Sequence, residues 1–124
     1  MLWNKTKSPR KIGDHTELFA EQYLIQQGLV TVDKKVHCRQ GEIDLIMHHG
    51  DTLVFIEVKY RKNTNFGGAI AAVSASKQKK IKHCAVFFLH KAQLNEYNTP
   101  CRFDVIALEG DINNPKVTWL KNAF

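Results

Sequence analysis

The stretch GEIDLIMHHGDTLVFIEVK, residues 41–59, decides the fold of this chain. Apolar residues alternate with their neighbours along both halves of the stretch, which is the period of a β-strand. Gly50-Asp51 lies between the halves, and a pair that begins with glycine suits a two-residue type II′ turn. The stretch therefore predicts a β-hairpin in which His49 faces Thr52.

The register of this hairpin brings two carboxylates together. Counting back from the turn places Asp44 opposite Glu57, and directly opposed residues have Cβ atoms roughly 5 Å apart. The same count places Glu42 opposite Lys59. A four-residue turn would leave Asp44 and Glu57 diagonal to each other, roughly 7–8 Å apart but still on one face. Only an odd-length turn or a bulge would separate them.

A carboxylate pair of this kind has a chemical use. Two close carboxylates repel each other unless one holds a proton or a cation lies between them. Oxygen ligands suit magnesium or manganese. Lys59 projects from the same side of the strand as Glu57, so its ammonium can contact an attacking water or a phosphate. Asp44, Glu57 and Lys59 are therefore candidate catalytic residues for metal-assisted hydrolysis of a phosphodiester.

The same residues also allow a simpler interpretation. Glu42 and Lys59 could form an ordinary cross-strand ion pair, while Asp44 and Glu57 could lie on a solvated face. A fully exposed face does not normally carry large apolar side chains. The side chains that disfavour a solvated face are those of Ile46, Leu53 and Phe55.

The pattern Asp44…Glu57-Val58-Lys59 resembles that of the PD-(D/E)xK nuclease superfamily, which includes restriction endonucleases and archaeal Holliday junction resolvases. Over nearly its whole length the chain is similar to the YraN family of small bacterial proteins within that superfamily. Ile43 departs from the pattern, because it stands where the proline is expected. The similarity lies in the 17–28 helix, GEIDLI at 41–46, VFIEVKYR at 54–61, FGGA at 66–69, KQ at 77–78, RFDV at 102–105 and NAF at 122–124.

The resemblance implies an α/β fold with a mixed central β-sheet flanked by helices, of the restriction-endonuclease type. It also implies that Glu17, on the first helix, joins Asp44 and Glu57 as a metal ligand. The residues alone leave a second role open, because Glu17 could instead close a capping box with Asp14. Glu21 lies one helical turn further along and is a weaker candidate.

Substrate contacts are expected from basic residues. The resemblance gives Lys77 and Gln78 a role in positioning the substrate, and it implies that two copies of the chain pair as a homodimer. Arg39 leads into the hairpin and Arg61 and Lys62 follow it, where they could contact a phosphate backbone. Asp104 is expected to pair with Arg102 or a neighbour, or else to reach the site.

Composition bounds the class of protein. The chain has 124 residues, of which 44% are hydrophobic and 24% charged, values typical of one globular domain. Its net charge of +6 favours a polyanionic partner, although the charge could serve only solubility. No apolar run is long enough for a membrane span, and the first 12 residues lack the hydrophobic core of a signal peptide. We therefore expect a cytoplasmic protein whose Cys38, Cys84 and Cys101 are reduced thiols.

The rest of the chain divides into simple elements. Residues 1–12 are expected to form a basic arm, and residues 13–124 a single domain. A helix is predicted from Asp14, as N-cap, to Gly28, followed by an edge strand over residues 29–38. A second helix is predicted over residues 76–90, capped by Ser74 or Ser76, before two strands near the C-terminus. The expected order is αβββαββ, with Phe66 and the glycines at 67–68 in a long connection.

These features predict a magnesium- or manganese-dependent nuclease that acts on DNA, including branched or repair intermediates. A second hypothesis is a nucleic-acid-binding accessory protein that retains the nuclease fold without catalysis. A third is a protein-interaction scaffold whose basic charge is incidental. The sequence alone leaves these three alternatives open.

Overall fold

The protein is described by a computed structural model over residues 9–63 and 73–124. The expected order αβββαββ is confirmed. The elements are α1 (Pro9–Gln26), β1 (Val30–Cys38), β2 (Gly41–His49), β3 (Thr52–Arg61), α2 (Ala75–Lys91), β4 (Cys101–Glu109) and β5 (Lys116–Leu120). The expected connection around Phe66 and the glycines at 67–68 lies outside the described residues.

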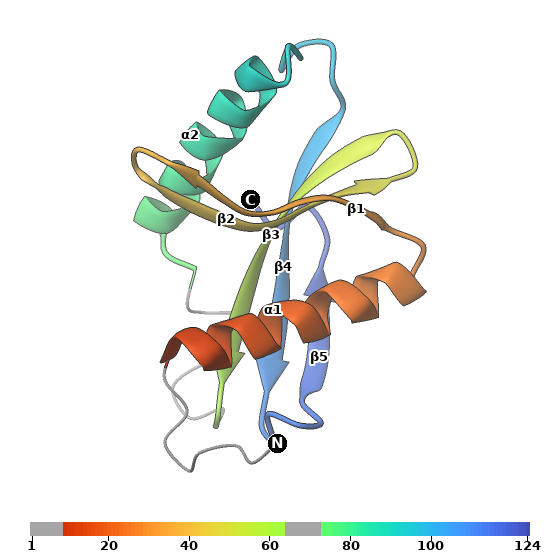
Figure 1. Ribbon diagram of the computed structural model, residues 1–124, viewed down its shortest axis with the longest axis vertical. Helices are drawn as coiled ribbons and strands as arrows, with labels where there is room; N and C mark the ends of the chain where they lie inside the picture. The colour runs from red at the N-terminus through yellow and green to blue at the C-terminus, as the bar shows by residue number, and fades with distance from the viewer. Residues whose placement is uncertain (1–8, 64–72) are drawn as a thin grey trace.

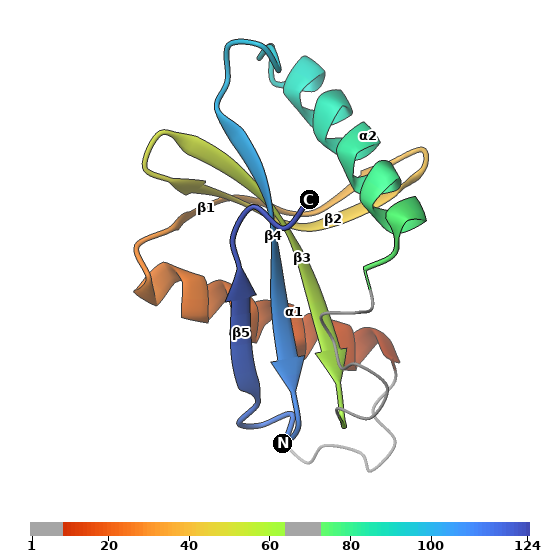
Figure 2. The same ribbon diagram turned by 180° about the vertical axis from the view of Figure 1, so that it is seen from behind.

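The five strands form one mixed sheet between two helices. Their order is β1-β2-β3-β4-β5, and every neighbouring pair is antiparallel except β3 and β4. A parallel pair needs a crossover, and the segment that contains α2 supplies it. Figure 1 shows α1 in front of the sheet, and Figure 2 shows α2 on the opposite side. The expected α/β fold with a mixed sheet flanked by helices is therefore confirmed.

Each face of the sheet carries its own hydrophobic core. On one face Ala20 and Leu24 of α1 pack against side chains of β2, β3 and β4. On the other face Ile81 and Leu89 of α2 pack against a second set, which includes Phe55. Residues of β3 alternate between these two cores, because successive side chains of a strand point to opposite faces. The central strands are therefore buried on both sides.

The hairpin has the predicted turn. His49 pairs with Thr52, and Gly50 has φ +61°, whereas Asp51 is not in the positive-φ region. That combination is the one expected for a type II′ turn. β1 is an edge strand, as predicted, with most of its side chains exposed.

The first helix begins earlier than predicted. It starts at Pro9, so Asp14 lies inside the helix and the predicted N-cap at Asp14 is wrong. Proline favours the first helical position, because its fixed φ is helical and no N–H is needed there. Residues 9–12 of the expected arm thus belong to α1, while residues 1–8 lie outside the described residues. The predicted end is confirmed, since Gly28 has φ +98° just beyond α1.

Two local predictions in the second half of the chain are confirmed. The Ser74 side chain caps α2 by accepting a hydrogen bond from the Lys77 backbone N–H at 3.1 Å. Asp104 is fully buried and accepts hydrogen bonds from Arg102 Nε at 3.0 Å and from Trp119 Nε1 at 2.9 Å. The contact with Trp119 ties β4 to β5, so Asp104 has a structural role.

The prediction of three reduced thiols is wrong for two of them. Cys38 at the end of β1 and Cys84 on the buried side of α2 form a disulfide, with their Cα atoms 5.4 Å apart. Packing of α2 against the sheet brings these residues within the ordinary range for such a bond, and their sequence spacing gave no sign of it. Cys101 is a free thiol, and burial raises its pKa.

Candidate active site

The candidate site lies where β2 and β3 separate. Their last backbone pair is Leu45 with Ile56, after which β2 turns away from β3, as Figure 1 shows. Asp44 is the next residue of β2, and its Oδ2 accepts a hydrogen bond from the Val58 backbone N–H at 2.8 Å. The Asp44 side chain therefore replaces the strand pairing at this fork.

Glu57 lies beside Asp44, as the predicted register requires. The Glu57 side chain is only 4% exposed. Its pKa is raised to about 9, first by burial and then by a hydrogen bond and charge repulsion from Asp44. Lys77 and Lys59 offset part of this rise, because both place positive charge near the carboxyl. The two carboxyl groups thus meet across the fork, although backbone pairing ends one residue before them.

Glu17 reaches the same place from the other face of the sheet. Burial is the largest cause that raises the pKa of Glu17 to about 8, followed by the charge and hydrogen bonding of Asp44. Glu42 adds to this rise through its negative charge. Asp44 therefore lies between two acidic groups, with Glu17 supplied by α1 and Glu57 by β3. The interpretation in which Glu17 closes a capping box with Asp14 is wrong, because Asp14 lies inside the helix and is not its N-cap.

Two oxygens of this cluster have no hydrogen-bond partner among residues 9–63 and 73–124. Glu17 Oε1 and Glu57 Oε2 are both buried and accept no hydrogen bond. The nearest cations are Lys77 Nζ, 3.4 Å from Glu57 Oε2, and Lys35 Nζ, 4.0 Å from Glu17 Oε1. These ion pairs are electrostatic contacts without hydrogen-bond geometry. A buried carboxyl oxygen without a hydrogen bond favours the binding of a proton or of a cation.

The donor set fits a hard divalent cation. Carboxylate oxygens are the ligands that magnesium and manganese prefer, and Glu17, Asp44 and Glu57 would hold the ion. In the conformation described, no three His, Cys, Asp or Glu side chains of residues 9–63 and 73–124 are arranged to hold a metal. Metal binding would therefore require these side chains to move, and the carboxyl groups whose pKa is raised would have to lose their protons.

An open pocket of about 320 Å³ leads to the Glu17 side of the cluster. Its walls come from the first half of α1, from β1 and from the start of β2. Glu42 lies in this wall, and its backbone partner is His37 of β1. The pairing of β2 with β3 ends at Leu45 and Ile56, so the predicted pairing of Glu42 with Lys59 is wrong. The fork carries Glu42 away from β3. The lining residues are Gly13, Asp14, Glu17, Lys35, His37 and Glu42.

The basic and polar residues that were predicted to contact the substrate lie at different distances from the carboxyl cluster. Lys59 is half-buried on β3 and Lys77 contacts Glu57 from the start of α2. The Gln78 side chain instead donates to the Val73 carbonyl at 3.3 Å, which holds the residue that precedes the Ser74 cap. Arg39, Arg61 and Lys62 are exposed, the first in the β1–β2 turn and the others at the end of β3.

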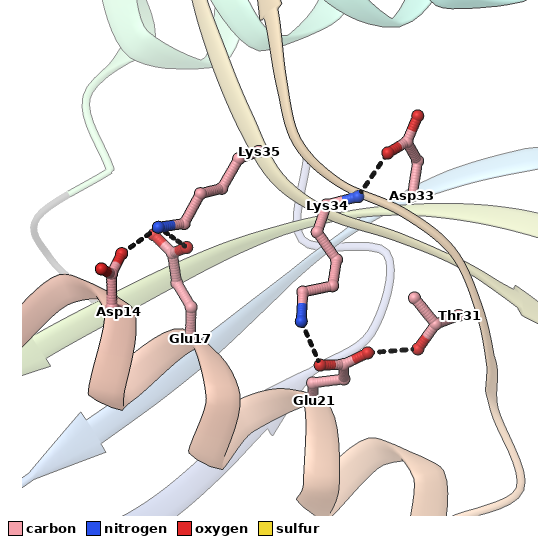
Figure 3. Close-up of polar contacts among 7 residues, drawn as sticks. All are labelled: Asp14, Glu17, Glu21, Thr31, Asp33, Lys34 and Lys35. Atoms are coloured by element: carbon pink, nitrogen blue, oxygen red, sulfur yellow. Dashed lines mark hydrogen bonds and ion pairs between the residues drawn. The ribbon is translucent and has the colours of Figure 1, made fainter.

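Glu21 does not join the site. Its carboxylate accepts hydrogen bonds from Thr31 Oγ1 at 2.6 Å and from Lys34 Nζ at 3.0 Å, as Figure 3 shows. Burial raises the pKa of Glu21, but these two bonds outweigh it and lower the pKa overall. Glu21 thus links α1 to β1.

Sequence reasoning missed Lys35. A regular strand would turn Lys34 and Lys35 to opposite faces, yet Figure 3 shows both side chains reaching α1. The cause is a bulge between Thr31 and Asp33, together with the positive φ of Lys35. No residue in this segment is a glycine or a proline, so the sequence carried no ordinary signal of the irregularity.

Comparison with known proteins supports a family assignment. The model of "Uncharacterised protein family UPF0102" matches residues 16–108. The chain belongs to the UPF0102 family. The expected membership of the YraN family, a nuclease-like group of the PD-(D/E)xK type, is thereby confirmed.

UPF0102 relatives are similar along almost the whole chain. A UPF0102 protein of Colwellia psychrerythraea is 63% identical, and the match covers 100% of both chains. One of Aeromonas hydrophila is 48% identical over 90% of this chain and 83% of its own. A relative in Pseudomonas syringae is 44% identical over 93% of this chain and 94% of its own. In the described part of the chain, no helix is long and apolar enough to cross a membrane.

Proposed function

We propose that this UPF0102 protein is a divalent-metal-dependent nuclease that hydrolyses phosphodiester bonds in DNA. The observation that carries the proposal is the fork, where Asp44 lies between the partly buried carboxyl group of Glu17 and the buried one of Glu57, each with one buried oxygen that has no hydrogen bond within the described residues. Carboxyl groups in an apolar setting reduce stability when ionised. A binding role for magnesium or manganese explains why the fold gathers them.

The chain's own residues divide the work of hydrolysis. Glu17, Asp44 and Glu57 would hold the ion, which would polarise a phosphoryl oxygen and lower the pKa of a bound water. Lys59 lies on the same side of β3 as Glu57, where its ammonium can orient the attacking water or the phosphate. Lys77 compensates Glu57 at 3.4 Å and is placed to contact the substrate as well.

DNA as the substrate rests on charge and position. The net charge of +6 favours a polyanion, and exposed basic side chains at Arg39, Arg61 and Lys62 offer phosphate contacts. A narrower proposal is that the DNA substrate is branched or is a repair intermediate. This proposal, like that of a homodimer, follows from the likeness to junction-cutting nucleases.

The decisive test is a cleavage assay. Full-length protein is incubated with magnesium or manganese and with single-stranded, duplex and four-way-junction DNA. We expect cleavage of at least one substrate, and a loss of roughly a hundredfold or more in Asp44→Ala and Glu57→Ala. Asp51→Asn, on the exposed turn of the same hairpin, is the matched control and should cleave normally. No cleavage of any substrate by the wild type would contradict a nuclease.

The alternative proposal is a nucleic-acid-binding accessory protein with the nuclease fold. It is supported by the described part of the chain, in which no three His, Cys, Asp or Glu side chains are arranged to hold a metal. This alternative expects salt-sensitive DNA binding that is unchanged by EDTA and unchanged in Asp44→Ala. A nuclease instead expects a manganese binding isotherm that disappears in Asp44→Ala.

A further inference from the structure

Lys35 is held against the acidic pocket by an unusual backbone. Its φ is +50°, in the left-handed region that residues with a side chain rarely adopt. The bulge just before it shifts the register of β1 against β2. Strained positions of this kind tend to occur where a side chain must be aimed at a functional site. Here the aimed group is an ammonium, and it points to α1 rather than to solvent (Figure 3).

The contacts of Lys35 differ from those of its neighbour. Lys35 forms an ion pair with Asp14 and lies 4.0 Å from Glu17 Oε1, one of the two buried oxygens without a hydrogen bond. Lys34 instead pairs with Glu21 at 3.0 Å, one helical turn further along α1. Two consecutive lysines thus contact glutamates on successive turns of the helix, Lys35 with Glu17 and Lys34 with Glu21. Only one of these glutamates belongs to the candidate metal site.

We propose that Lys35 is a built-in counter-cation of the site. Its ammonium occupies the position beside Glu17 that a divalent ion would take, so it must be displaced before the ion can bind there. An ammonium and a divalent ion at the same carboxylate repel each other, so only one can stay. Asp14 can keep the displaced lysine, because it already forms the closer ion pair. The Lys35 side chain is 41% exposed and lines the pocket of about 320 Å³, so it has room to move.

This inference rests on the proposed metal site and adds a device that sets its affinity. Lys35 weakens the site for metal, and while metal is absent it places a positive charge beside Asp14 and the Glu17 carboxyl group. Removal of Lys35 should therefore strengthen metal binding. Removal of Lys34 should strengthen it less, because that ammonium is paired with Glu21 and acts on Glu17 only through its charge, which lowers the pKa of Glu17.

The test is a calorimetric titration of the full chain with manganese at pH 7.5, comparing Lys35→Met with Lys34→Met. Each variant removes one positive charge that is close to Glu17, so the difference between them isolates the direct contact. Methionine keeps the Cβ and the length of the side chain, so the backbone strain is unchanged. We expect Lys35→Met to bind manganese roughly fivefold to tenfold more tightly than the wild type. Lys34→Met should stay within about twofold of the wild type.

Each outcome bears on the inference separately from the proposed nuclease. Tighter binding in Lys35→Met alone supports it, even if no DNA is cut or the wild type binds too weakly to measure. Equal affinity in wild type and Lys35→Met overturns it, while leaving the nuclease proposal intact if Asp44→Ala abolishes binding. No manganese binding by any variant overturns both. Lys35→Gln is the second variant, read in the same way if Lys35→Met does not fold.

Discussion

At the scale of single residues, the most informative groups are the three carboxyls at the fork. Glu17 and Glu57 have pKa values raised to about 8 and about 9, and burial is the largest cause for both. Near neutral pH both groups therefore favour the protonated form. Asp44 lies between them and accepts the Val58 N–H. The site is thus poised to exchange protons for a cation.

Glu57→Gln should remove a pH dependence of stability. The folded pKa of Glu57 lies above the unfolded value, so the native state binds more protons and stability falls as pH rises from about 4.5 to about 9. Glutamine cannot ionise. In EDTA we expect Glu57→Gln to raise the free energy of unfolding at pH 8 by on the order of 2 kcal/mol, with little change at pH 4.5. Urea denaturation at both pH values measures this.

The control for this experiment is Asp51→Asn, which changes an exposed carboxylate of the same hairpin. It should shift stability by less than about 0.5 kcal/mol at either pH. An equal effect of Glu57→Gln at pH 4.5 and pH 8 would show that packing, and not ionisation, decides its contribution.

At the scale of elements, β1 is held to both helices by different means. Its Lys34 and Lys35 reach α1, and its last residue, Cys38, is bonded to Cys84 of α2. An edge strand with mostly exposed side chains has little apolar burial of its own. These polar and covalent links therefore add to the backbone pairing with β2 in holding β1, which forms one wall of the acidic pocket.

Reduction of the disulfide should destabilise the fold. The bond joins residues 46 positions apart, and closing a loop of that length lowers the entropy of the unfolded chain. We expect dithiothreitol to lower the free energy of unfolding by roughly 2–4 kcal/mol. Urea curves with and without reductant measure the change. Cys38→Ser serves as control and should respond to reductant by less than about 0.5 kcal/mol; coincident wild-type curves would contradict a disulfide in solution.

The Ser74 cap should be measurable in isolation. Ser74→Ala removes the oxygen that accepts the Lys77 N–H, at a cost of about 1 kcal/mol in stability. Ser76→Ala is the matched control, because Ser76 is exposed inside the first turn of α2 and should change stability by less than about 0.5 kcal/mol. Thermal melts of the two variants give the comparison. A larger loss of stability in Ser76→Ala than in Ser74→Ala would show that Ser76, and not Ser74, caps the helix.

At the scale of the whole molecule, charge decides how the protein meets a nucleic acid. The net charge is +6, yet the candidate site is acidic. Protonation and nearby lysines reduce the negative potential that the cluster would otherwise present to phosphates. Exposed basic residues around the end of β3 and the β1–β2 turn then favour approach of the backbone.

DNA binding should therefore weaken with salt. A phosphate contact contributes about 0.9 to the slope of log K against log salt concentration. We expect Arg39→Ala to reduce this slope by about one contact, measured by fluorescence polarisation in EDTA. Lys116→Ala, at an exposed position of β5, should leave the slope unchanged. Equal slopes for wild type and Arg39→Ala would remove Arg39 from the interface.

Local patterns in the sequence determined the order of elements and the hairpin. Period-two alternation and a glycine-first turn depend only on neighbours, and the turn fixes the register by counting. Asp44 and Glu57 could therefore be placed together before any packing was known. A serine cap at Ser74 or Ser76 and the Gly28 stop were predictable for the same reason, because both are properties of a single helical turn, and the structure decided for Ser74.

Tertiary structure decided what joins that pair. The pairing of β2 with β3 ends at Leu45 and Ile56, so Glu42 keeps its partner in β1 but does not meet Lys59. Packing of α1 brings Glu17 to Asp44, packing of α2 brings Cys84 to Cys38, and a bulge turns Lys35 into the pocket. Such contacts join residues distant in sequence, so their geometry depends on how whole elements pack rather than on local pattern.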